Sequence, residues 1–226
     1  MGNKQGMRNV SAKTPEYVSH TSASTETSTA SLSIPSSLAV GDLLLILIGD
    51  ASSKSAFYNS FVAGTSVPSG WTKLNEWGDT VSDNHIGIFY RIVDGSEGSS
   101  VSISSQFSSR VYGFCVHITG ANETTPIGGA GVASINGGKA ALVISGLTGN
   151  ESDLGLFLYG FDGGDGYPFS LLSSTGWTLN GEIQTGIFGS GTSGCFGTRD
   201  SGASSLNVTV DPSISDGQVG VQIRVQ

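Results

Sequence analysis

Apolar and polar residues alternate along much of this chain with a period of two, which is typical of strands with one buried face. The clearest example is QVGVQIRVQ at residues 218–226, and VSISS at 101–105 and LNVTV at 206–210 follow Gly- and Ser-rich turns. Four further segments are apolar on both faces, as in strands covered on each side: residues 42–49, 85–93, 110–118 and 153–161. No window of about 12 or more residues carries an uninterrupted helical stripe. The pattern predicts an all-β protein with essentially no helix.

The same pattern occurs twice. SGWTKL at residues 69–74 is nearly matched by TGWTLN at 175–180, and the match extends in both directions when the chain is aligned with itself. The offset stays at roughly 105 to 112 residues, as expected of a diverged duplication. The aligned pairs are Leu32 with Leu142, Ile34 with Ile144, Asp42 with Asp153, Asp50 with Asp162, and Asp94 with Asp200.

Two such halves predict a jelly-roll or Greek-key β-sandwich, because each half buries its apolar faces only by packing against the other. The predicted organisation is an N-terminal arm over residues 1–27 and a single β-sandwich domain over 28–226, with half-repeats at about 28–120 and 138–226. Trp71 and Trp177 are equivalent in this alignment, and each follows a Gly where a strand begins. We expect both to close one end of the core, and the alternative is that they stack on a ligand.

Composition narrows the possible partners. Charged residues make up only 12% of the chain, and the net charge is −8 with ten Lys and Arg, so a basic stripe for nucleic acid is lacking. The start of the chain is the exception, since Lys4, Arg8 and Lys13 have no acidic neighbours and predict a docking arm. No apolar leader opens the sequence, and the longest apolar run, residues 43–48, is too short to span a bilayer. We therefore expect synthesis in the cytoplasm without a signal peptide, and no membrane association.

Candidate chemistry is sparse. Cys115 and His117 share one face of a strand, but parallel side chains at this spacing are poorly placed for a direct hydrogen bond. Cys115 and Cys195 are expected to be buried thiols, because their spacing fits neither a zinc site nor a disulfide framework. Asp162 and Asp165 offer oxygens for Ca²⁺, although Asp-Gly pairs are primarily turn formers. The sequence predicts no catalytic residue and no cofactor, so we expect a protein that is not an enzyme.

The loops that follow the long buried strands, residues 50–70 and 162–176, differ most between the two copies. If both emerge at one end of a sandwich, their aromatic residues would form a surface suited to a protein partner or a sugar. The alternative is that these aromatics fold back and cap the core. The candidate residues are Phe57, Tyr58, Phe61, Tyr167 and Phe169.

Four short motifs follow one another in the first half of the chain, and the resemblance that they carry extends over roughly residues 20–226: Leu-x-Ile-Pro, Val-Gly-Asp-Leu-Leu-Leu, Pro-Ser-Gly-Trp-Thr, and Tyr-Arg-Ile-Val ahead of a Gly/Ser turn. In this order they resemble a jelly-roll module of virion proteins in tailed bacteriophages, which serves in capsid decoration proteins, head fibres and tail fibres. The resemblance implies a non-enzymatic structural protein of the virion, most simply a capsid decoration or head-fibre protein that contacts other virion proteins. It supplies no catalytic residue.

Other functions are compatible with the same fold. A carbohydrate-binding module or a tail-fibre receptor-binding domain would use the aromatic loops, and a polysaccharide hydrolase or lyase would need a close carboxylate pair that no strand face offers. Because edge strands of sandwiches are often covered by a symmetric neighbour, we expect a homo-oligomer, with a trimer among the expected states.

Overall fold

Strands are the only regular elements in the part of the chain that the computed structural model describes, and every pairing is antiparallel. The predicted all-β fold class is therefore confirmed. The described residues are 13–51, 69–78, 84–104, 110–131, 134–136, 141–150, 152–162, 169–172, 176–185, 191–199, 208–211 and 217–226.

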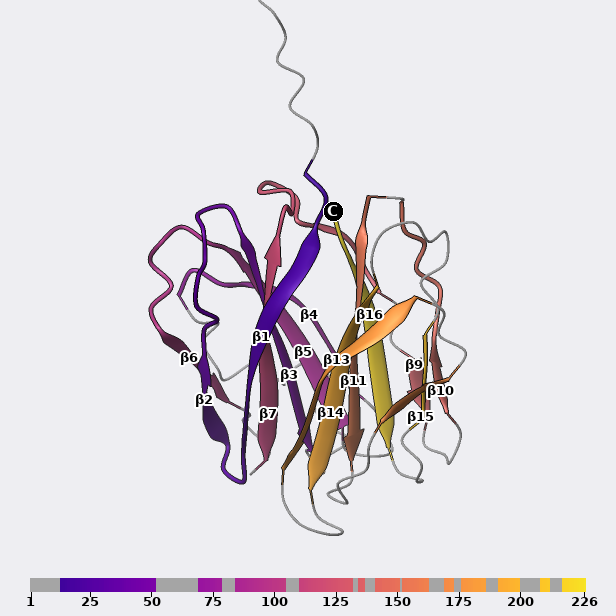
Figure 1. Ribbon diagram of the computed structural model, residues 1–226. Helices are drawn as coiled ribbons and strands as arrows, with labels where there is room; N and C mark the ends of the chain where they lie inside the picture. The colour runs from indigo at the N-terminus through magenta and orange to yellow at the C-terminus, as the bar shows by residue number, and fades with distance from the viewer. Residues whose placement is uncertain are drawn as a thin grey trace, which may run out of the picture.

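The first half of the chain forms one large and one small sheet, seen in indigo and magenta in Figure 1. The large sheet has the order β1 (Glu16–Thr25), β7 (Val111–Thr119), β3 (Leu43–Ala51), β5 (Asn84–Ile92) and β4 (Thr72–Gly78). The small sheet pairs β2 (Thr29–Ser33) with β6 (Ser100–Ser104). The chain moves between the two sheets at β1–β2–β3 and at β5–β6–β7, which is the wiring of a jelly roll.

The second half repeats this arrangement. Its large sheet has the order β13 (Trp177–Thr185), β14 (Thr192–Arg199), β11 (Leu154–Asp162), β16 (Gln218–Val225) and β8 (Ile127–Ala130), and β9 (Ser134–Asn136) also pairs with β16. Its small sheet has the order β10 (Leu142–Ile144), β15 (Val208–Asp211) and β12 (Ser170–Leu172). The equivalent strands are β3 and β11, β5 and β14, β4 and β13, and β7 and β16.

Local irregularities repeat as well as strand order. The register between β4 and β5 shifts between Lys73 and Asn75, and the register between β13 and β14 shifts between Leu179 and Gly181. Each bulge lies at the same distance after the Trp of its Gly-Trp-Thr phrase. The repeated Gly-Trp-Thr motif therefore marks the same bulged strand in two copies of one fold.

The two large sheets pack face to face, and each carries its small sheet on the outer side. Strands β3 and β5 lie against β11, and β1 lies against β13. The long apolar runs are explained by this arrangement, because alternate side chains of one strand enter different cores. Leu43, Leu45 and Leu47 lie in the central core between the halves, whereas Leu44 and Ile46 lie in the outer core under β2 and β6. The two sheets that we expected from the sequence are thus the inner layers of a four-sheet stack.

The predicted boundary of the N-terminal arm is corrected by β1. Residues 16–25 belong to the body, because β1 pairs along its length with β7. Its sequence, EYVSHTSAST, contributes few large apolar side chains: Tyr17 packs against the central core and Ala23 against the outer one. An edge strand in which half of the residues are Ser or Thr gives only a weak hydrophobic alternation, which is why the sequence pattern does not reveal it.

The predicted equivalence of Asp50 and Asp162 is also wrong. Strands β3 and β11 have nine residues each and begin directly after Asp42 and Asp153. Counting from these starts pairs Asp50 with Phe161, and Asp162 with Ala51. A shift of one residue moves a position to the other face of a sheet, so Asp50 and Asp162 do not occupy equivalent positions in the two halves.

The two ends of the body differ. At one end β1 begins, and the C-terminus lies nearby, where the backbone N–H of Gln226 donates to the carbonyl of Pro126 at 3.0 Å (Figure 1). Strands β3 and β11 end at the opposite end, where β5 and β14 begin: Ala51 pairs with Asn84, and Asp162 pairs with Thr192. Strand β1 therefore begins, and β16 ends, at the end of the body opposite to the one where β3 and β11 end.

Candidate functional sites

The Gly-Trp turn of the first half lies against Arg91, which comes near the end of β5. Gly70 has a φ of 83°, and a Cβ at this position would lie 2.7 Å from Arg91 Nη1. A side chain would therefore be strained by the backbone and blocked by the guanidinium. Trp71 follows directly, is only 8% exposed, and lies in the outer core of this half.

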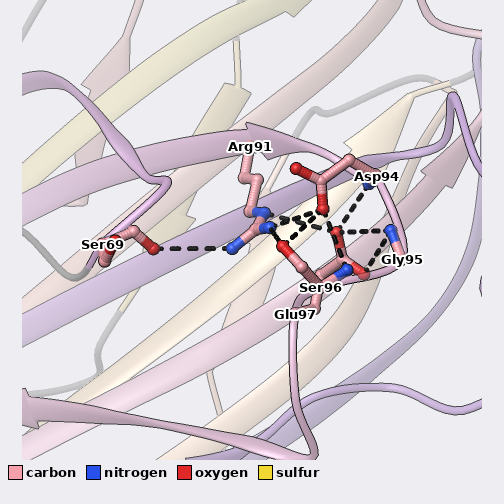
Figure 2. A network of polar contacts seen from close by, with 6 residues as sticks. All are labelled: Ser69, Arg91, Asp94, Gly95, Ser96 and Glu97. Carbon is pink, nitrogen blue, oxygen red and sulfur yellow. Dashed lines mark hydrogen bonds and ion pairs between the residues drawn. The ribbon is translucent and has the colours of Figure 1, made fainter.

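Arg91 is buried, and its guanidinium links two turns of the chain (Figure 2). Nη1 donates to the carbonyl of Ser69 at 3.4 Å, and Nη2 donates to Asp94 Oδ1 at 2.7 Å and to Ser96 Oγ at 2.6 Å. Nε lies 3.3 Å from Glu97 Oε1, which also accepts the backbone N–H of Asp94 at 2.7 Å. The oxygens of Asp94, Ser96 and Glu97 that could bind a cation thus surround the guanidinium of Arg91. The network joins the turn after β5 to the turn before β4.

Asp94 is the exposed member of this network, and its pKa is held well below its ordinary value. The hydroxyl and the backbone N–H of Ser96 are the main causes, because both donate to the carboxylate, and Arg91 adds to the effect. Asp94 is therefore ionised at neutral pH, and it has no proton to give as a general acid.

The second half contains the same arrangement of Gly, Trp and Arg. Gly176 has a φ of 82°, and a Cβ there would lie 3.2 Å from Arg199 Nε. Trp177 pairs with Arg199 across β13 and β14, and it is 8% exposed in the outer core. Its ring makes an edge contact with Phe157, with ring centroids 5.3 Å apart. Both Gly-Trp phrases therefore serve packing, with the Gly admitting an Arg and the Trp filling the core.

A second pair of equivalent contacts ties the residues just before β3 and β11 to the last strand of each half. Asp42 Oδ2 lies 2.7 Å from His117 Nε2 and accepts the backbone N–H three residues before it at 2.8 Å. Asp153 Oδ2 lies 3.3 Å from Arg224 Nε and accepts the corresponding N–H at 2.7 Å. One aspartate thus fixes the turn before the central strand in each half, with a histidine partner in one half and an arginine partner in the other.

These contacts exclude the Cys115–His117 pair as a nucleophile and base. His117 is paired with Asp42, and burial raises the pKa of the Cys115 thiol to about 12. Cys195 is also buried, and its pKa is raised by burial and by Glu182. Both cysteines are free thiols that stay protonated at neutral pH, so neither offers a thiolate.

A cluster of buried polar groups lies at the opposite end of the body. Asp50 Oδ1 lies 3.6 Å from His85 Nδ1 on the outer face of the first large sheet. On the inner face, the hydroxyl of Tyr112 and the side-chain amide of Asn84 are buried without a hydrogen-bond partner among the described residues. A Cβ on Gly160 of the facing sheet would lie 2.6 Å from the Tyr112 hydroxyl and 3.0 Å from Asn84 Oδ1. Both groups therefore meet at the interface between the halves.

Phe169, one of the aromatic residues predicted on the loop surface, is buried. This residue is only 7% exposed and lies in the outer core of the second half, with its ring centroid 5.5 Å from that of Tyr159. Its backbone N–H donates to Glu182 Oε1 at 2.7 Å, and the next residue begins β12 of the small sheet. This part of the loop returns along the core because its apolar side chain is buried there, as the capping alternative requires. The other four candidates, Phe57, Tyr58, Phe61 and Tyr167, lie outside the described residues.

The remaining predicted site residues are partly described. Lys13 is exposed just before β1, whereas Lys4 and Arg8 lie outside the described residues. Asp162 is the last residue of β11, and Asp165, its predicted companion for Ca²⁺, lies outside. Within the described ranges, no group of three or more His, Cys, Asp or Glu side chains is placed to hold a metal ion.

Comparison with protein-family models, with curated proteins and with solved structures finds no match to this chain. Among the described residues there is no helix of the length and apolar character needed to cross a membrane.

Sequence reasoning did not identify the partners of Arg91 and of Asp42. The sequence contains one signal for such a contact: the repeat aligns Asp42 with Asp153, and an aspartate repeated just before a buried strand indicates a repeated partner. The partner itself could not be found, since His117 lies 75 residues from Asp42 and is replaced by Arg224 in the other half.

Proposed function

We propose that this protein is a non-enzymatic structural component of a bacteriophage particle, docked on other virion proteins through its N-terminal arm. The observation that carries the proposal is the position of Lys13, which precedes β1 at one end of the body. Lys13 is exposed at the end where β1 begins, and the body extends from there for the full length of its strands (Figure 1). An arm at one end and a stable body beyond it suit a protein that is anchored at one point and faces outward.

The polar groups of the body also support a structural role. Arg91, Asp42, Asp153 and Arg224 are each engaged in contacts that hold turns to strands. The thiols are buried and protonated, and the turn oxygens that would suit a cation surround Arg91. Such networks stabilise a fold, and the groups within them are engaged in holding turns to strands, which suits a structural role.

Carbohydrate binding is supported less well. Stacking of sugars needs exposed aromatic faces, and Phe169 is buried against Tyr159. The two Gly-Trp tryptophans are also in the cores and are not available as stacking platforms.

Purified particles test the proposal. We expect the protein in gradient-purified virions, and we expect its loss from them when Lys4, Arg8 and Lys13 are all changed to Glu. A matched control changes Lys54, Lys73 and Lys139 to Glu, which alters the net charge equally and should leave the protein on the particle. A protein absent from virions would overturn the proposed function, and equal retention of both triple variants would overturn the role of the arm.

A further inference from the structure

The edges of the two large sheets are protected against pairing with other strands, with one exception. An edge strand exposes unpaired backbone groups, and proteins block such edges with bulges, charges or short strands. Here β4 has a bulge together with Lys73 and Glu76, and β13 has a bulge together with Glu182. At the remaining edge of the second sheet, β8 has only four residues and a register shift.

The exception is β1. Its single register shift lies between Tyr17 and Ser19, and residues 19–25 then pair regularly with β7. This stretch, SHTSAST, has no Lys, Arg, Asp, Glu, Pro or Gly. Burial lowers the pKa of His20, so its ring is neutral at pH 7. Within the described residues β7 is the only strand that pairs with β1, and every side chain of β1 is at least partly exposed.

The charge of the chain indicates which partner fits this edge. With a net charge of −8, two copies repel each other over most of their surface, but this stretch adds no charge to that repulsion. It is also complementary to itself. An antiparallel pairing centred on Ser22 places Ala23 opposite Thr21 and Ser24 opposite His20, so no like charges face each other and no bulky side chains collide.

We propose that β1 pairs with β1 of a second copy of this chain, antiparallel and about a two-fold axis at Ser22. The first large sheets of the two molecules then form one continuous sheet. A two-fold contact of this kind uses the same surface on both partners and closes at two copies. The pairing predicts a dimer in place of a trimer. It goes beyond the proposed function, because it concerns contacts between copies and holds for the protein free in solution.

Cysteine cross-linking tests the axis directly. In the Ser22→Cys variant two cysteines meet at the two-fold axis, where opposed strand residues come within the distance a disulfide spans. The control is Ser102→Cys, an equally exposed serine on β6, and the native Cys115 and Cys195 are buried and do not interfere. Under mild oxidation we expect a disulfide-linked dimer of Ser22→Cys to form at least about tenfold faster than one of Ser102→Cys, because pairing raises the effective concentration of the two thiols.

A second pair of variants tests association without cross-linking. Ser22→Lys places two ammonium groups at the axis, so it should abolish the concentration-dependent dimer in sedimentation velocity, whereas Ser102→Lys should preserve it. Circular dichroism confirms that each variant is folded. Equal cross-linking of the two cysteine variants, or equal association of the two lysine variants, would overturn the proposal.

Discussion

Two buried tyrosines allow the packing of this fold to be tested with changes of a single hydroxyl group. Tyr112 lies between the halves, and its hydroxyl has no hydrogen-bond partner among the described residues. Tyr159 lies in the outer core of the second half, and its hydroxyl donates to Gln218 Oε1 at 3.0 Å. Both rings are fully buried, so a change to Phe keeps the ring and removes only the polar group.

The two substitutions are expected to have opposite effects on stability. A buried hydroxyl without a partner costs about 1–3 kcal/mol relative to water, so Tyr112→Phe should raise the free energy of unfolding by about 1 kcal/mol. Tyr159→Phe removes a hydrogen bond and leaves the buried oxygen of Gln218 with one partner fewer, so it should lower the free energy of unfolding by about 1 kcal/mol.

Urea unfolding followed by tryptophan fluorescence measures both changes, with unaltered slopes showing that the same surface is exposed on unfolding. For a protein of this size, 1 kcal/mol also corresponds to a shift of about 2–4 °C in Tm. If Tyr112→Phe is destabilised as much as Tyr159→Phe, the Tyr112 hydroxyl is satisfied in the folded protein, by Asn84 or by a bound water between them. Tyr112 would then contribute no unpaired hydroxyl to the interface of the halves.

Two substitutions and one labelling experiment test the outer networks and the outer cores. Arg91→Ala should lower the free energy of unfolding by about 3 kcal/mol in urea titrations, because it leaves the buried carboxylate of Glu97 without its cation, and a loss below about 0.5 kcal/mol would contradict this role. In the folded protein the pKa of Asp94 is lower than its ordinary value of 3.8. Its contribution to the free energy of unfolding is therefore complete above pH 3.8 and is lost as the pH falls through the lower, folded pKa. Asp94→Asn should flatten the acid side of the stability curve measured between about pH 5 and 2. Cys115 and Cys195 should react with a maleimide only at the rate of unfolding, and rapid labelling of the native protein would contradict their burial.

The sequence predicts this fold well where the apolar pattern is strong. Residues 42–49 and 153–161 are recognisable as central strands because each must fill two cores, and the Gly-Trp-Thr phrases mark the duplication because Gly70 and Gly176 both admit an Arg side chain. Where the pattern is weak, prediction fails. Half of the residues of β1 are Ser or Thr, and the strand is held by pairing with β7, a partner that lies far along the chain.

Contacts within the candidate sites were harder to predict than the strands. His117 was considered as a partner of Cys115, two residues away, whereas its contact is Asp42 on another strand. The alignment of Asp50 with Asp162 was one residue out of register, because a match of identical residues ignores the face that each side chain must occupy. The prediction places Phe169 on a surface because it lies in the loop that follows a long buried strand, but its own position is fixed by the core around Tyr159.

The proposed function is tested most directly by electron cryomicroscopy of phage particles with this protein present and deleted. We expect density on the wild-type particle that fits the β-sandwich, attached at the end where β1 begins, and loss of that density when the gene is deleted. Identical density in the two particles would contradict it.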